Sequence, residues 1–149
     1  MIKAETYRLE KTGQIKGFRI LADHKRLNIY AGGGADYAIS VAFLRAHRQA
    51  AKTFLTGICE GITVARQNKA KALEIMTKSE RGSDPAALEY LYRLYTTEVI
   101  PARPYPKVEG VELGIQMVAS TVPSARGMKT QELIDATLME ELVKEGRCN

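Results

Sequence analysis

AKTFLTGICEGITVA, residues 51–65, holds the apolar pattern that decides the fold class of this chain of 149 residues. Apolar side chains recur there at helical intervals, at Ala51, Phe54, Leu55, Ile58, Ile62 and Ala65. This spacing places them on one face of a helix over about four turns. The opposite side carries Lys52, Thr53, Glu60 and Gln67. The stretch therefore predicts an amphipathic helix.

The next segment predicts further helical structure. Residues 70–76 continue the pattern as a further helix or a kinked extension, ended by the polar run KSERGS (78–83). Asp84 then offers a side-chain acceptor at an N-cap. Pro85 suits the first helical position, because an N–H would have no partner there. We expect the helix that begins here to end near Val99.

The last third predicts a linker and two more helices. PARPYP (101–106) cannot continue a helix, because its three prolines fix the backbone, and it is expected to be an extended linker. One helix is expected over 108–120 and another from near Thr130. Asp135 is predicted to restart the latter as an N-cap, and Gly146 to end it as a left-handed stop.

The front of the chain predicts two short strands. One is expected in KGFRILAD (16–23) and the other over Tyr37–Val41. The fold class is therefore α+β and mainly α-helical, with about two short strands and four to five helices. A single domain is expected over 1–149, with a strand and loop segment over 1–41 and a helical part over 42–149.

The glycine run YAGGGADYAIS (30–40) lies at the second predicted strand. It lacks the Lys-Ser or Lys-Thr pair of a P-loop, and its spacing is not GxGxxG. A strand, rather than a helix N-terminus, is expected directly after it, which also argues against a phosphate-binding loop. The two tyrosines that flank the run, Tyr30 and Tyr37, are instead kept as candidate ligand contacts.

The other polar residues predict neither a metal site nor catalysis. His24 and His47 are far apart, with no further ligand at metal-binding spacing, so no metal and no cofactor are expected. No nucleophile lies in a recognisable arrangement with a base, so the chain is not expected to be an enzyme. Two acidic pairs are assigned structural roles: Glu109 with Glu112, and Glu140 with Glu141.

The charge, the two cysteines and the first residues of the chain narrow the possible partners and compartments. The net charge of +5 is concentrated in the first third, without an RNP-like motif or helix-turn-helix spacing, so no nucleic-acid partner is expected. Cys59 and Cys148 are predicted to be free thiols, with Cys59 buried and inert. MIKAETYRLEK (1–11) has no apolar core of a signal peptide, so a cytoplasmic location is expected for the chain as given.

Four stretches resemble, in family order, motifs of the solute-binding proteins of ABC importers, and the closest group is the sulfonate, nitrate and thiamine-precursor type. They are GFRILAD (17–23), SVAFLRAHRQAAKTFLTGICEGITVARQNKAKALEIMTK (40–78), PYPKVEGVELGIQ (104–116) and LIDATLMEELVKEG (133–146). The resemblance implies a type II periplasmic-binding-protein fold, here a partial one. In that fold two α/β lobes close around a small ligand, and the bound form docks on a membrane permease.

The resemblance covers only the C-terminal half of such a protein. It implies a truncated domain of an ABC import system that binds a small organic or anionic ligand weakly or not at all. By the resemblance, the glycine run would lie at the mouth of the ligand cleft, which adds Gly32, Gly33 and Gly34 to Tyr30 and Tyr37 as candidate ligand contacts. Full-length relatives are periplasmic, and their partner is the ABC permease.

Two further expectations concern partners. Helices that normally cover a sheet would here expose their apolar faces, which predicts a homodimer. The alternative reading is a free-standing helical module of the cytoplasm that binds a protein or a small ligand.

Overall fold

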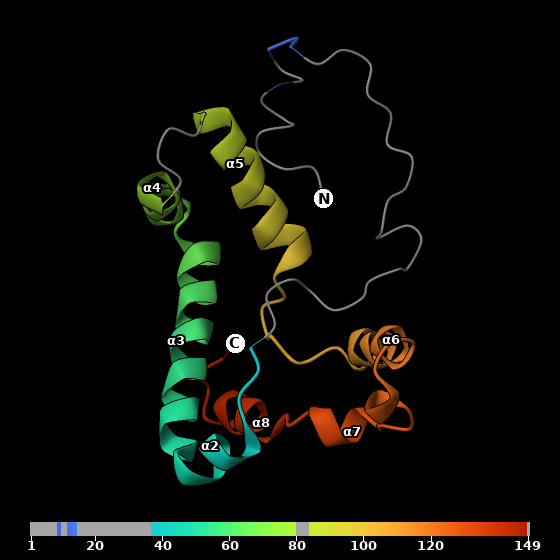
Figure 1. Ribbon diagram of the computed structural model, residues 1–149. Helices are drawn as coiled ribbons and strands as arrows, with labels where there is room; N and C mark the ends of the chain where they lie inside the picture. Colours follow the sequence, from blue (N-terminus) through green and yellow to red (C-terminus); the bar gives the residue numbers. More distant parts are fainter. Residues whose placement is uncertain (1–8, 10–11, 15–36, 80–83, 149) are drawn as a thin grey trace.

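The computed structural model of this protein describes residues 9, 12–14, 37–79 and 84–148 (Figure 1). Its helices, in chain order, are α2 (Val41–Ala46), α3 (Arg48–Gln67), α4 (Lys69–Ser79), α5 (Pro85–Leu94), the π-helix η1 (Tyr95–Val99), α6 (Val108–Ala119), the 3-10 helix η2 (Pro123–Ala125), α7 (Thr130–Leu133) and α8 (Thr137–Lys144). Helix accounts for 71% of these described residues, and none of them forms a strand. The prediction of a mainly α-helical chain is confirmed.

The strand predicted over Tyr37–Val41 is wrong, because the chain there leads directly into helix α2. The Ser40 backbone is extended, with φ −70° and ψ 146°, and its Oγ accepts a hydrogen bond from the Phe43 N–H at 3.1 Å. This N-cap satisfies a donor that the first helical turn leaves unpaired. Val41 therefore begins a helix, although its branched side chain also favours strands. The other predicted strand, 16–23, lies outside the described residues.

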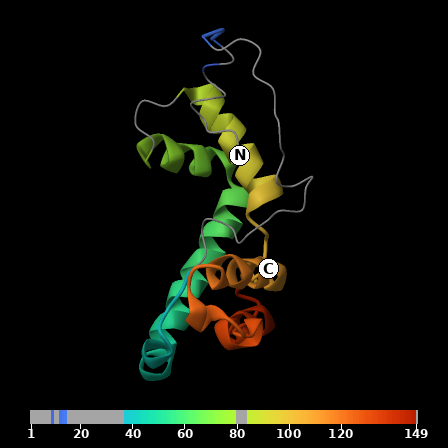
Figure 2. The same ribbon diagram turned by 45° about the vertical axis from the view of Figure 1, so that its right-hand side comes forward.

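Helix α3 is the longest described helix, and its two ends contact different neighbours (Figures 1 and 2). Helices α2 and α8 contact α3, and both lie near the end where it begins. At the other end, α3 contacts α4 and η1, and α5 packs on both of these. Helix α6 contacts α7 and η2 instead. The described part of the chain is thus a set of helices arranged along α3, with the α6–α7 group beside α8.

The continuation predicted after α3 is a separate helix, α4, because the chain breaks at Asn68. This residue leaves the helical region, with φ −132° and ψ 80°. Its N–H donates to the Val64 carbonyl at 2.8 Å, while its Oδ1 accepts from the Lys71 N–H at 3.0 Å. One asparagine thus ends α3 and caps α4, which is the local competition expected of its short amide side chain.

The start signal predicted at Asp84 is confirmed. Its Oδ1 accepts a hydrogen bond from the Ala86 N–H at 2.9 Å, and Pro85 is the first residue of α5. The helical path then widens into η1, where the Ile100 N–H donates to the Tyr95 carbonyl at 2.9 Å. The segment ends at Val99, as predicted.

The C-terminal third also follows the predicted order. Helix α6 occupies the range expected for it, and the proline-rich segment 101–106 before it is not helical. The last predicted helix is divided into α7 and α8, because Ile134 is extended, with φ −109° and ψ 126°. Asp135 restarts the helix: its Oδ1 accepts hydrogen bonds from the Thr137 N–H at 2.9 Å and hydroxyl at 2.6 Å. Gly146 has φ 70°, which confirms the predicted left-handed stop.

The buried core is small and lies mainly between α3 and α8. A cluster of four buried residues, Cys59, Met139, Leu142 and Cys148, is flanked by the partly buried Leu55 and Val143. The apolar stripe predicted for α3 is correct at Ala51, which is buried, but wrong at Phe54, whose side chain is 50% exposed. Thr56 and Cys59 are buried instead, because α8 covers that side of α3.

Candidate functional site

Tyr37 is the one predicted ligand contact within the described part of the chain. The others lie outside the described residues: Tyr30, Gly32, Gly33 and Gly34. The Tyr37 side chain is 63% exposed, and its ring meets the Phe54 ring edge-on, with centroids 5.0 Å apart and planes at 79°. Edge-to-face contact suits the charge distribution of aromatic rings. The pair presents apolar faces and a phenol hydroxyl to the surface.

Large apolar side chains next to this pair are exposed as well. They lie at Ile39, Val41 and Phe43, and we name them, together with Tyr37 and Phe54, the α2 apolar segment. A second exposed set lies on and after α6, at Val108, Met117, Val118, Val122 and Leu133. Exposed apolar residues are ordinary singly, but several close together favour contact with another surface.

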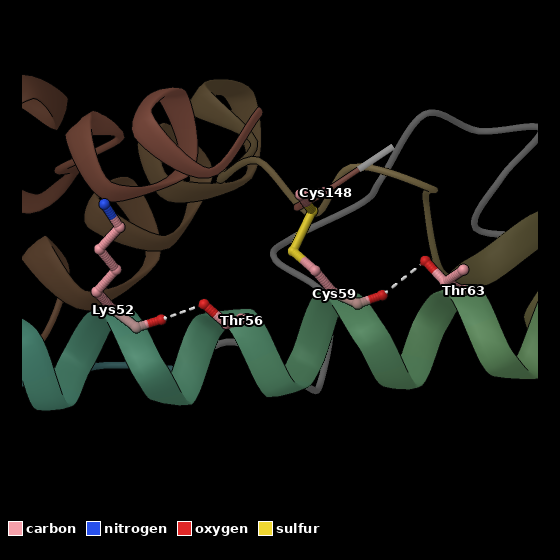
Figure 3. The surroundings of a disulfide bond; sticks show 5 residues. All are labelled: Lys52, Thr56, Cys59, Thr63 and Cys148. Atoms are coloured by element: carbon pink, nitrogen blue, oxygen red, sulfur yellow. Dashed lines mark hydrogen bonds between the residues drawn. A yellow bond between two sulfur atoms is a disulfide. The ribbon is translucent and has the colours of Figure 1, made fainter. Parts of the chain in front are cut away.

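A disulfide bond between Cys59 and Cys148 links the middle of α3 to the segment after α8 (Figure 3). The prediction of free thiols is therefore wrong, although the predicted burial of Cys59 is confirmed, since both residues are 1% exposed. The Cα atoms are 5.1 Å apart, and the two residues are 89 positions apart in sequence. Closing so long a loop reduces the entropy of the unfolded chain, an effect worth roughly 4–5 kcal/mol.

The turn that follows α8 brings Cys148 back to α3. The Gly146 N–H donates to the Val143 carbonyl at 3.0 Å, and the Arg147 N–H donates to the Leu142 carbonyl at 2.9 Å. This pair of bonds is the Schellman motif, which requires a left-handed residue at its centre. Gly146 adopts φ 70° without the clash that a Cβ would cause. The chain therefore turns immediately after the helix, and Cys148 reaches Cys59.

Ion pairs continue the α3–α8 contact toward the start of α3. Arg48 binds the Glu141 carboxylate and also donates to the Thr137 hydroxyl at 3.3 Å. The Lys52 Nζ lies 3.1 Å from Glu141 and 2.6 Å from Glu145. Figure 3 shows Lys52 and Cys59 projecting from the same side of α3. Arg48 thus binds Thr137 and Glu141, and Lys52 binds Glu141 and Glu145. The contacts follow the same order along both segments.

These contacts shift the pKa values of the groups involved. Hydrogen bonds from Arg48 and then Lys52 lower the pKa of the Glu141 carboxyl. Hydrogen bonds to Glu145 and then Glu141 raise the pKa of the Lys52 ammonium. The pKa of Asp135 is lowered by the hydroxyl and then the backbone N–H of Thr137. Each shift favours the charged form, so the network stabilises α8 at neutral pH.

The other candidate residues in the described part of the chain are His47, Glu109, Glu112, Glu140 and Glu141, while His24 lies outside it. In the residues that the structure describes, no three His, Cys, Asp or Glu side chains are placed to hold a metal ion. Glu109 and Glu112 are exposed on α6, and Glu140 is exposed on α8 while Glu141 pairs with α3. The His47 ring lies against the Phe43 ring, with centroids 5.0 Å apart.

Comparison with known proteins gives no match, whether to a family model, a curated protein or a solved structure. Across the described ranges, every helix is too short or too polar to cross a membrane.

Sequence reasoning missed the α3–α8 contact, although its parts were visible. Lys52 and Cys59 are seven residues apart, which places them on one face of a helix. Gly146 comes two residues before Cys148, so a turn of the chain could have been expected there. Nothing in either local pattern indicates that the two segments meet.

Proposed function

We propose that this chain is a non-catalytic, solute-binding-protein-like domain of an ABC import system. The observation that supports the proposal best is the exposure of apolar side chains on the segments that carry the resemblance. These segments form α2, α3, α4, α6 and α8, and large apolar groups on them are exposed at Phe54, Ile75 and Val108. Helices of a solute-binding protein pack on an α/β lobe, which would cover such groups.

The ligand proposed is a small organic or anionic solute, held weakly or not at all by this chain alone. Tyr37 is the proposed contact within the described residues, since it is largely exposed beside Phe54. A phenol can donate a hydrogen bond to a sulfonate or nitrate oxygen while its ring packs on an apolar part of the solute.

A thermal-shift series tests ligand binding. The chain is heated with a sulfonate, nitrate, a pyrimidine or an aromatic acid, and a true ligand at a hundredfold excess over its Kd should raise Tm by roughly 5–10 °C. Tyr37→Ala should reduce the shift, while Tyr105→Ala, in the segment 101–106, should not. Uniformly flat melts across all four classes would contradict ligand binding.

We also propose that the chain forms a homodimer, with the ABC permease as its further partner. The α2 apolar segment supports self-association, since pairing two copies would remove these side chains from water. Analytical ultracentrifugation should give twice the chain mass of 16.5 kDa. A stable monomer at tens of micromolar protein would contradict the dimer, and Phe43→Asp should shift a true dimer toward monomer.

The Cys59–Cys148 bond supports a periplasmic site of action over a cytoplasmic one. Disulfides persist in oxidising compartments and are rare where thiols are kept reduced. The periplasm is also the compartment implied by the resemblance. Trapping of thiols in intact cells, followed by mass analysis, should find both cysteines protected from alkylation.

A second candidate is a free-standing helical module that binds a protein partner. The exposed Tyr37–Phe54 pair supports it, because aromatic side chains dominate the energetics of many protein interfaces. Two measurements separate the candidates. A thermal shift with one of the four solute classes would favour the first, and a loss of partner binding on Phe54→Ala would favour the second.

A further inference from the structure

We propose that the Cys59–Cys148 disulfide is a redox-controlled latch that holds α8 on α3. In the oxidised chain α8 covers the middle of α3, and in the reduced chain it separates while the α4–α5 end stays folded. The inference does not depend on the solute-binding proposal. It follows from what else holds α8 in place.

Helix α8 has few other attachments. Among the helices that the structure describes, α3 is the only one that α8 contacts. Its buried side chains are Leu138, Met139 and Leu142, and the last two belong to the same cluster as the disulfide sulfurs. The bond therefore lies within the buried cluster that α8 shares with α3.

The ion pairs are too weak to replace the bond. Arg48 and Glu141 keep 43% and 41% of their side chains exposed, and Glu145 keeps 44%. Exposed ion pairs contribute little, because water and salt screen them and the long side chains lose rotamer freedom. Helix α8 also has only 8 residues, fewer than the roughly 12–15 that an isolated helix needs to be even marginally stable in water. Once released, it should lose its helical structure.

The redox step is a thiol–disulfide exchange with a dithiol. One thiolate of the dithiol attacks a sulfur of the protein disulfide, forming a mixed disulfide and freeing one cysteine thiolate. The second thiol of the dithiol then displaces the other cysteine as a thiolate, so the dithiol becomes a disulfide and the two cysteine thiolates take up two protons. Both cysteines are 1% exposed, so attack requires the turn at Gly146 to open first. The reverse exchange, with a disulfide-bearing oxidant, closes the latch.

Hydrogen exchange measured by mass spectrometry tests the latch on the full chain, with dithiothreitol as the dithiol. Full reduction is verified by alkylation of both cysteines. Reduction should then speed exchange in residues 137–148 by about tenfold or more and leave residues 69–94 unchanged. The double variant Cys59→Ser, Cys148→Ser should exchange as fast as the reduced chain in residues 137–148. Dithiothreitol should not change its exchange rates. Lys52→Gln, which removes two ion pairs but keeps the disulfide, is the matched control and should stay close to the oxidised wild type.

Two results would overturn the proposal. Unchanged protection of residues 137–148 after complete reduction would mean that packing alone holds α8. Equal loss of protection at residues 69–94 would mean that the bond maintains the whole fold rather than one end.

Discussion

The two ends of α3 are stabilised in different ways. Near its beginning, α8 is attached by a disulfide and three ion pairs around a core of four buried residues. Near its end, α4 and α5 pack through Ala72, Ala87 and Leu88, with the Arg66 guanidinium donating to the Ile100 carbonyl at 2.7 Å. The first end depends on the redox state of its surroundings, and the second on packing, the Arg66 hydrogen bond and an ion pair between Lys69 and Glu89, none of which responds to a reductant.

Removing the disulfide should have the largest effect and should act through the α8 end. Cys148→Ser is expected to cost about 2–5 kcal/mol of unfolding free energy, since the unfolded chain regains its loop entropy. This corresponds to a fall in Tm of about 10 °C for a chain of this size. Thermal melts with and without dithiothreitol measure it. A variant that melts like the oxidised wild type would contradict the difference between the two ends.

Truncating the packed core at the other end should cost slightly less and should not respond to reductant. Leu88 is 3% exposed, and Leu88→Ala is expected to cost about 3 kcal/mol through lost burial and a cavity. The loss in Tm should be the same in the oxidised and reduced chains. Leu142→Ala is the counterpart at the α8 end, where the loss should shrink once the disulfide is reduced.

A matched pair of glycine substitutions sharpens the comparison at the turn after α8. Gly146→Ala should cost about 1 kcal/mol, because alanine at φ 70° is strained, and should slow closure of the disulfide in oxidative refolding. Gly57→Ala places the same methyl group within α3, where nothing lies within 4 Å. This control should raise stability by about 0.5–1 kcal/mol. Equal effects of the two changes on closure would contradict a special role for the turn.

A fall in pH should have the smallest effect on stability among these changes, and it should act mainly on α8. The folded pKa values of Glu141 and Asp135 lie below their ordinary values of 4.5 and 3.8. The contribution of these two groups to folding stability is therefore complete above their ordinary pKa values. It is lost as the pH falls through their lower pKa values in the folded chain. The raised pKa of Lys52 works oppositely: its contribution is complete below 10.5 and is lost as pH rises through the folded value.

Thermal melts across the pH range test these signs. Stability from this network should be level between about pH 5 and 10 and should decline in acid. Glu141→Gln should reduce the acid decline in the exchange protection of α8. Glu74→Gln is the control, because the pKa of Glu74 is also lowered, by Lys78 and then Lys71, but within α4. If Glu141→Gln leaves the acid decline in the exchange protection of α8 unchanged, other carboxyl groups cause that decline.

Local signals predicted the helices well, and the reasons are visible in the contacts. Asp84 and Gly146 act within a few residues of themselves, so their roles as cap and stop can be inferred from the sequence. The apolar repeat likewise specified α3 as a helix. At Tyr37–Val41, the branched and aromatic residues suggested a strand, but the Ser40 cap determined the outcome.

Long-range features could not be predicted in the same way. The pairing of Cys59 with Cys148 depends on where α8 lies relative to α3, which no local pattern specifies. The same is true of Phe54, an apolar stripe residue that is half exposed because α8 covers another side of the helix. The site was therefore less predictable than the elements that carry it.

The position of the disulfide also determines how the chain would respond to a protease. The bond between Cys59 and Cys148 makes everything from α4 to α8 part of one covalent ring. A single cut in the extended segment 101–106 would open the ring without releasing a fragment. The cut protein would keep its full mass on a non-reducing gel and separate into two pieces only after reduction, so in an oxidising compartment this part of the molecule can survive a break in its backbone.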